Sequence, residues 1–378
     1  RDLHSFPTRR SSDLNLLPFT PSYAGSEILA ANSPWQTLAR LSGFDGIHYY
    51  HIIEQGYQNI AGVQAFFPLY PLLIKLLAKI IPLSPIVIGV SISIICFYLF
   101  LRWSFNDLRQ DYSAKIAWWW VLIWLSFPSS FFLLCFYTES LFLLLLWLAF
   151  RAYKHRHFGK LLLFGGLLSA TRLVGAVAIT AIALDFLYQS WQQKTYRQLV
   201  FWRQLLMIAV SNWGLVAYGL YLQITFGDPL LFVHVQSVHF SGRQTDKLIT
   251  IPQVIYRYGK MFFANIPLSW KTYALTQEFI FSLLALALLI IIAIKAWREK
   301  KIPLSLVWWL FSVGAFMLPT LTGSFASMPR YLLACICLPA FLAIIFAQKK
   351  IWGQIFLLCC WCLLSINLLL FIAGLWVA

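Results

Sequence analysis

The side chains best suited to chemistry lie in the segment of residues 44–57. This segment holds two carboxylates, Asp45 and Glu54, and two imidazoles, His48 and His51, within a sequence that is otherwise largely apolar. Asp45 and His48 are three residues apart, so on a helix they lie on the same face. A carboxylate in this position can act as a general base, with His48 orienting it.

Other roles for this segment remain open. Asp is a common N-cap, so Asp45 could simply cap a helix that starts at Gly46. Glu54 would point the same way as Asp45 if the helix continues, or it could be solvated. A divalent metal shared by Asp45, His48 and Glu54 is a further option, but Mg²⁺ and Mn²⁺ prefer more oxygen ligands. We therefore expect no metal and no other cofactor.

The composition predicts an all-α, multi-pass membrane protein. The 378 residues are 60% hydrophobic and only 11% charged. The net charge of +16 comes from short basic clusters between apolar runs, which indicates cytoplasmic loops and not a surface that binds nucleic acid. The acids at 45, 54, 139, 228, 246 and 278 then fall on the non-cytosolic side. All seven cysteines lie in apolar stretches, and we interpret them as small buried residues outside any disulfide or zinc site.

Apolar windows predict the membrane-spanning elements of a bundle. A spanning helix needs about 20 apolar residues. Seven windows meet this need, and a shorter one follows Glu139, so we expect about eight full transmembrane helices. They cover residues 84–103, 116–136, 139–153, 205–226, 274–296, 302–320, 331–347 and 351–377.

The apolar stretch 161–188 requires a different structure, because basic clusters flank it at both ends. Both ends then lie on the cytoplasmic side, so the chain must cross an even number of times within this stretch. The stretch is too short for two full helices, so we predict two half-length helices that form a hairpin. They would meet near residues 171–175, with Arg172 at the tip on the same side as Asp45. One long tilted helix, with Arg172 reaching to the interface, is the alternative.

The remaining segments divide the chain into regions. The sequence HSFPTRRSSDL at residues 4–14 reads as a translated sequencing adapter, so we exclude residues 1–14 and expect that a first transmembrane helix is missing. Residues 15–83 form a first extracytoplasmic loop, and residues 84–378 form the transmembrane domain, with a long outer loop at 227–273. Residues 66–81, and more weakly 248–265, are typical of helices that lie on the membrane.

Five motifs occur in order along the chain. They are Phe44-Asp45 through Gly56-Tyr57 with Ala65-Phe66-Phe67-Pro68; Phe127-Pro128-Ser129-Ser130 with Tyr137-Thr138-Glu139-Ser140; Ala170-Thr171-Arg172-Leu173; Phe226-Gly227-Asp228-Pro229; and Met328-Pro329-Arg330-Tyr331. Together they resemble the PIG-V family of GPI mannosyltransferases and its prokaryotic relatives, within the GT-C superfamily of membrane glycosyltransferases. The resemblance covers most of residues 20–345.

The resemblance implies an integral membrane enzyme that transfers a sugar, with mannose expected, to an acceptor hydroxyl with inversion. The donor would be a polyprenyl or dolichyl phosphate sugar. The catalytic acid of the family maps onto Asp45, and Phe44 stands where many members have Trp. A prokaryotic member would lie in the plasma membrane, with its active site on the outer face.

The donor phosphate needs a cation, and arginine offers a bidentate fork. Arg330 and Arg172 are the candidates, although either could be an interfacial anchor. Glu139 could pair with Arg172, or it could simply favour the start of a helix. Candidate substrate-binding or supporting residues are Tyr49, Glu54, Tyr57, Phe67, Glu139, His234 and His239. The two histidines could equally be interfacial.

Two other functional classes remain open. A lipid flippase or transporter without transferase activity could also use broken helices and buried arginines, and a non-catalytic assembly subunit is a third class. The acids and histidines concentrate on one side of the predicted bundle, whereas transporters place such residues at the membrane midplane. This distribution favours the transferase.

Overall fold

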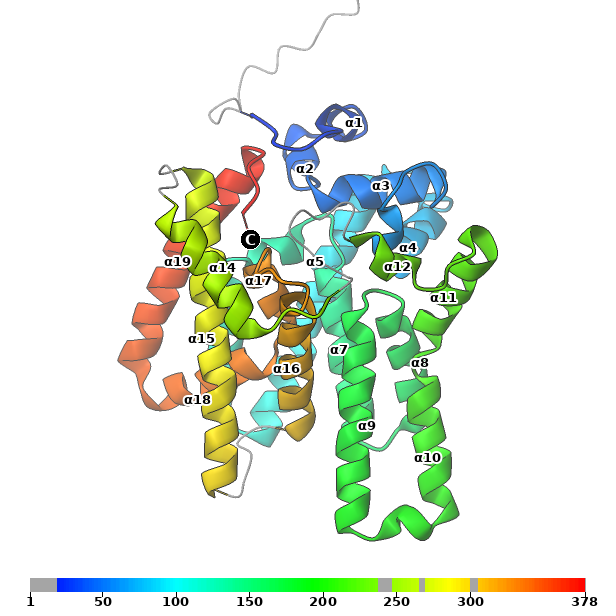
Figure 1. Cartoon of the computed structure of the whole chain (residues 1–378), viewed down its shortest axis with the longest axis vertical. Coiled ribbons are helices and arrows are strands. Elements are labelled where there is room, and N and C mark those ends of the chain that lie inside the picture. The colour runs from blue at the N-terminus through cyan, green and yellow to red at the C-terminus, as the bar shows by residue number, and fades with distance from the viewer. Residues whose placement is uncertain (1–18, 237–246, 265–268, 300–304, 378) are drawn as a thin grey trace, which may run out of the picture.

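The computed structural model describes residues 19–236, 247–264, 269–299 and 305–377, and in these ranges every regular element is helical (Figure 1). Within the described ranges, four helices are long and apolar enough to cross a membrane. They are α5 (Pro85–Asp111), α9 (Val174–Gln192), α15 (Trp270–Glu299) and α19 (Lys350–Ile372). The number rises to six if two bent helix pairs each count as one span. The protein is thus an all-α, multi-pass membrane protein, but eight full spans are not confirmed.

Several predicted spans are shorter than expected or are broken. The window 116–136 forms α6 (Ala114–Ser126), which ends before Phe127-Pro128 because proline disfavours a helical residue before it; the 3₁₀ helix η2 (Ser130–Leu134) follows. The window 205–226 forms α10 (Leu199–Val210) and α11 (Trp213–Phe226), bent by 47°. The window 331–347 forms α17 (Met328–Tyr331), η4 (Leu332–Ala334) and α18 (Cys337–Gln348), bent by 78°. Two further predicted spans are short helices, α7 (Glu139–Lys154) and α16 (Leu306–Thr320).

The predicted turn at Arg172 is present and the single tilted helix is wrong, but only α8 (Phe158–Ser169) is half-length, because α9 is long enough to span the membrane. Helix α8 leads to a turn that contains Arg172, and α9 leads away from it. Gly175 permits this close turn, since a Cβ there would lie 2.5 Å from the carbonyl oxygen of Leu168. The two helices are unequal, with 12 and 19 residues, and the hairpin runs over 158–192 instead of 161–188.

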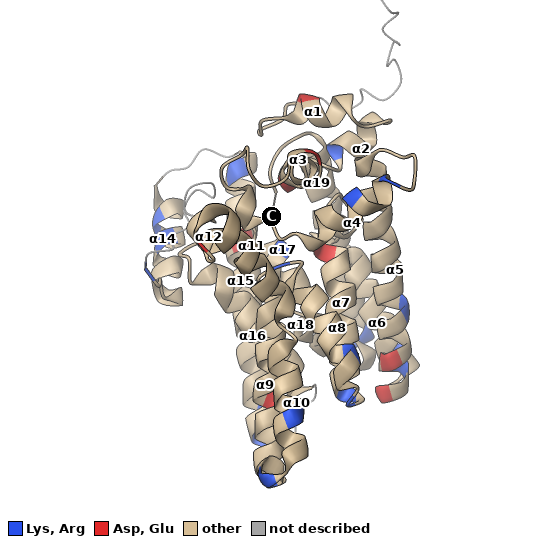
Figure 2. Ribbon diagram, turned by 90° about the vertical axis from the view of Figure 1, so that its right-hand side faces the viewer, with Lys and Arg blue, Asp and Glu red and all other residues tan. Residues whose placement is uncertain are grey.

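Short helices cover one end of the bundle, which we call the α3 end (Figure 1). They include α1 (Ser26–Ala31), α2 (Gln36–Arg40), α3 (Asp45–Gln55), α4 (Leu69–Ala78), α12 (Leu231–His234) and α14 (Ile251–Phe263). Helices α4 and α14 correspond to the two segments predicted to lie on the membrane. Figure 2 shows many of the Lys and Arg positions at the opposite end of the bundle, at the tips of α8, α10 and α5.

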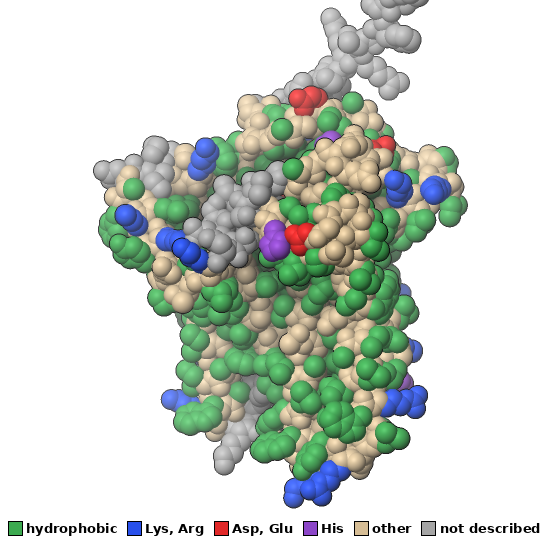
Figure 3. All heavy atoms as spheres, turned by 45° about the vertical axis from the view of Figure 1, so that its right-hand side comes forward, with side chains coloured by type: hydrophobic (Ala, Val, Ile, Leu, Met, Phe, Trp, Pro, Cys, Tyr) green, Lys and Arg blue, Asp and Glu red, His purple; other side chains and the backbone are tan. Residues whose placement is uncertain are grey.

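The largest fully buried side chains of the bundle are mostly aromatic, and apolar side chains also cover its outside. Trp120 packs against Phe100, Trp124 and Trp147, with ring centroids 5.5–6.0 Å apart. Apolar side chains cover the flank seen in Figure 3, as expected for a surface that faces lipid. Five of the seven cysteines are buried as predicted, but Cys359 and Cys362 are exposed on α19; all seven are free thiols.

Candidate functional site

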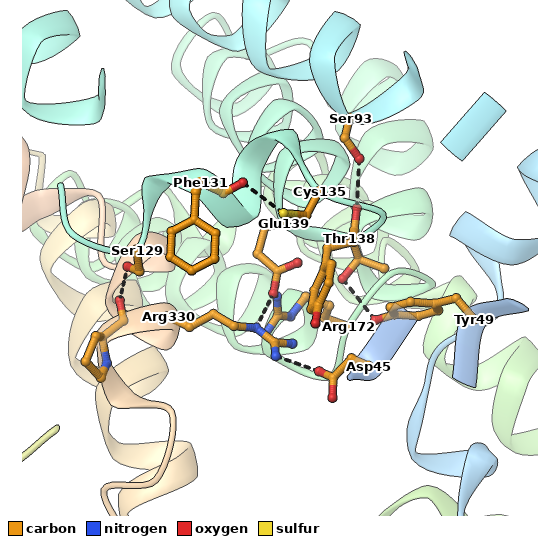
Figure 4. Close-up of polar contacts among 12 residues, drawn as sticks. Asp45, Tyr49, Ser93, Ser129, Phe131, Cys135, Thr138, Glu139, Arg172 and Arg330 are labelled. Carbon is orange, nitrogen blue, oxygen red and sulfur yellow. Dashed lines mark hydrogen bonds and ion pairs between the residues drawn. The ribbon is translucent and has the colours of Figure 1, made fainter. Parts of the chain in front are cut away.

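Asp45 occupies the first turn of α3 and is not its N-cap. The N-cap is Phe44, with φ 57° and ψ −113°, and its ring packs against Tyr23, Phe371 and Trp376 with centroids 4.5–5.3 Å apart. The Asp45 carboxylate instead binds Arg330, with Oδ2 2.6 Å from Nη1 (Figure 4). The alternative of a simple helix cap is therefore wrong.

Arg330 belongs to a buried network of four charged side chains (Figure 4). Its Nε donates to Oε1 of Glu139 at 2.6 Å, and the same oxygen accepts from Nη1 of Arg172 at 2.6 Å. The side chains of Glu139 and Arg330 are only 2% and 6% exposed, whereas those of Asp45 and Arg172 are 16% and 17% exposed. Two cations and two anions leave the network neutral. The predicted Glu139–Arg172 pair is confirmed.

Neighbouring groups hold the Arg330 guanidinium in place. Its central carbon lies 5.3 Å from the ring centroid of Phe132 and 5.0 Å from that of Tyr137, within range of cation–π attraction. The Tyr137 hydroxyl donates to the carbonyl of Gly43 at 2.8 Å, two residues before Asp45. Ser129 donates to the carbonyl of Pro329 at 2.7 Å. Both parts of the second sequence motif, around residues 129 and 137, thus support the Asp45–Arg330 contact.

A cavity of about 190 Å³ opens beside this network. Asp45, Arg172 and Arg330 all line it, so a ligand there can reach a carboxylate and two guanidinium groups. The other lining residues are mostly apolar or aromatic: Tyr49, Ala65, Phe66, Phe67, Thr171, Leu173, Val174, Val233, Gln236, Leu318, Pro319, Thr322 and Tyr331. The cavity therefore combines a polar end with apolar walls, as small-molecule sites commonly do.

Three predicted supporting residues lie at or near the cavity. Tyr49 and Phe67 line it, and the Tyr49 hydroxyl lies 3.3 Å from that of Thr138. Tyr57 does not line the cavity but holds a residue that does, because its hydroxyl donates to the carbonyl of Phe66 at 2.8 Å. The His48 ring stacks on Phe66 with centroids 4.8 Å apart, so it packs behind a lining residue. That His48 orients Asp45 stays a prediction.

The other predicted residues lie farther from the network. Glu54 is exposed and does not line the cavity, which agrees with the alternative that its carboxylate is solvated. Nδ1 of His234 lies 2.6 Å from Oδ2 of Asp228, and this hydrogen bond lowers the pKa of Asp228. His234 is half-exposed next to Val233, which lines the cavity. His239 lies outside the described residues.

Four polar residues that line the cavity were not among the predicted site residues. Thr171 and Tyr331 directly adjoin Arg172 and Arg330, so their motifs could have indicated them. Thr322 and Gln236 carried no such signal. Within the described ranges, no group of three or more His, Cys, Asp or Glu side chains is placed to hold a metal ion.

No protein-family model, curated protein or solved structure matches the chain. Membership of the PIG-V family therefore stays a prediction from the five motifs. What the protein does has to be inferred from those motifs and from the geometry of the site.

Proposed function

We propose that the protein is an inverting GT-C-type glycosyltransferase of the PIG-V kind. It would transfer a sugar, with mannose the first candidate, from a polyprenyl or dolichyl phosphate to an acceptor hydroxyl at the non-cytosolic membrane face. The contact between Asp45 and Arg330 carries this proposal, because it joins a carboxylate and a guanidinium at one cavity of a membrane protein. The reaction needs both groups, a base for the acceptor and a cation for the phosphate.

The reaction is a single displacement at the anomeric carbon. The acceptor oxygen forms a bond to this carbon while the bond from the carbon to the phosphate oxygen breaks. The electron pair leaves with the phosphate, and the acceptor proton moves to the Asp45 carboxylate. Arg330 and Arg172 stabilise the charge that develops on the phosphate. A phosphate leaves without a proton, so one carboxylate suffices for inversion.

The neutral network suggests how donor binding prepares the base. Arg330 donates through Nη1 to Asp45 and through Nε to Glu139. A donor phosphodiester carries one negative charge and competes with Asp45 for the guanidinium. Transfer of this guanidinium to the phosphate frees Asp45 to accept a proton when the donor is in place.

The test is sugar transfer by the protein in liposomes, with radiolabelled polyprenyl phosphate mannose as donor and membrane lipid extract as the source of acceptor. We expect a labelled product from the wild type and a rate lower by about 100-fold or more in Asp45→Asn, the usual contribution of a general base. Glu27→Gln is the matched control, because Glu27 is an exposed acid of α1 at the same end of the bundle and should leave the rate unchanged.

Two results would contradict the proposal. One is transfer at the wild-type rate by Asp45→Asn. The other is movement of the labelled donor between the leaflets, without any transfer, by both wild type and variant. This second result would support the transporter class.

A further inference from the structure

The segment that leads into Arg330 has a strained backbone. Ser327 adopts φ 63° and ψ 17°, the left-handed conformation that residues with a side chain rarely occupy. It precedes the short helix α17, on which Arg330 is the third residue. Strain of this kind persists only where the surrounding structure imposes it. The direction in which Arg330 points therefore depends on the groups that hold Ser327.

Glu278 of α15 holds Ser327 directly. Its Oε1 accepts from the Ser327 amide at 2.8 Å, and its Oε2 accepts from the Tyr258 hydroxyl of α14 at 3.0 Å. The Tyr258 oxygen in turn accepts from the Phe325 amide at 3.1 Å. Two side chains thus bind two backbone amides just before α17. Hydrogen bonds to a charged carboxylate are among the stronger ones in proteins.

Neither residue has a part in the site described above. Glu278 and Tyr258 are 7% and 3% exposed, and neither lines the cavity. A buried carboxylate is costly unless its oxygens are hydrogen-bonded. One oxygen of Glu278 binds the Ser327 amide, and the other binds a hydroxyl that itself holds Phe325. Both oxygens therefore act on the segment that carries Arg330.

We propose that Glu278, together with Tyr258, is a positioning residue that directs Arg330 toward Asp45 and toward a lipid phosphate in the cavity. This inference rests on the proposed phosphate-binding role of Arg330. It does not require that the protein transfers sugar. Loss of the Glu278 carboxylate releases the strained Ser327 and lets α17 shift, so the guanidinium loses its fixed place.

The experiment measures two quantities in lipid nanodiscs. Hydrogen–deuterium exchange of peptides that span residues 321–331 reports how firmly the segment is held. The Kd for polyprenyl phosphate, which contains no sugar, reports the position of Arg330. The variants are Glu278→Ala, which removes both acceptors, and Glu278→Gln, which keeps a carbonyl oxygen for Ser327. Thr276→Val is the control, because it loses one hydrogen bond of α15, to the carbonyl of Thr272 in the same helix.

In Glu278→Ala we expect faster exchange over 321–331 and a Kd weaker by about tenfold, which corresponds to one lost hydrogen bond to a charged group. Compared with Glu278→Ala, Glu278→Gln should restore most of the slow exchange and most of the affinity, and Thr276→Val should match the wild type. Unchanged exchange in Glu278→Ala would refute the contact. Faster exchange with an unchanged Kd would refute the positioning role. Because the Kd needs no turnover, failure of sugar transfer in the wild type would refute the proposed function alone.

Discussion

Glu139 offers the sharpest test of the charged network, because one of its oxygens serves two arginines. Oε1 accepts from Arg330 and from Arg172, both at 2.6 Å, and the side chain is 2% exposed. Glu139→Gln keeps an acceptor of similar shape but removes the negative charge, which leaves two cations and one anion. Removing one partner of a buried ion pair typically costs about 3–5 kcal/mol. Arg172 is 17% exposed and regains some hydration, so we expect a loss of about 3 kcal/mol in the free energy of unfolding.

The double variant Glu139→Gln/Arg172→Gln separates charge balance from simple loss of contacts. It restores neutrality, with Arg330 paired to Asp45. We therefore expect it to recover about 1–3 kcal/mol relative to the single variant, the range of coupling energies for residues in one network. The measurement is the free energy of unfolding in bicelles by steric trapping.

Asp228→Asn is the matched control for burial. The Asp228–His234 pair has the same 2.6 Å separation, but its side chains are 32% and 58% exposed. Exposed pairs contribute little to stability, so this variant should unfold almost like the wild type. The reasoning fails if Glu139→Gln is no less stable than Asp228→Asn, or if the double variant is no more stable than Glu139→Gln.

Two further predictions concern the fold and its orientation. A Cβ at Gly166 of α8 would lie 1.7 Å from Nε1 of Trp213, so Gly166→Ala should lower the free energy of unfolding by about 1–3 kcal/mol through overpacking. Gly159→Ala, on the same helix with nothing within 4 Å, should match or slightly exceed the wild type in the same steric-trapping assay. For orientation, a cysteine at exposed position Gln58 should react with a membrane-impermeant maleimide in intact cells, and one at exposed Gln193 only after permeabilisation. The reverse labelling pattern would place the cavity on the cytosolic side and contradict the proposed orientation.

The hairpin shows how far local sequence information reaches. Basic clusters on both sides of residues 161–188 required an even number of crossings, and this parity correctly placed a turn at Arg172. The lengths of the two helices were wrong, because α9 continues to Gln192 and packs against α16 and α10. Such contacts lengthen a helix beyond what hydropathy indicates. The break after Ser126 was missed although Pro128 could have indicated it.

The residues of the candidate site were predicted, but most of the contacts among them were not. Asp45, Arg172 and Arg330 were each expected to act, and Glu139 was expected to pair with Arg172. The direct contact of Asp45 with Arg330 had no signal in the sequence, and neither did the role of Glu278 before Ser327. Asp45 and Arg330 are 285 residues apart (330 − 45), and Glu278 and Ser327 are 49 residues apart, so no local pattern relates either pair.

The sequence alone determined that this is a helical membrane protein with a few polar residues near the ends of its apolar segments. Hydropathy and charge act locally, so each window reports its own tendency to cross the membrane. Only the tertiary structure decided which of those polar residues meet. The start of α3, the start of α7, the tip of the α8–α9 hairpin and α17 must all reach one point before four charges can neutralise one another. Helix packing brings these four segments together. The four charges then have to pair with one another, because an unpaired buried charge would be too costly to keep.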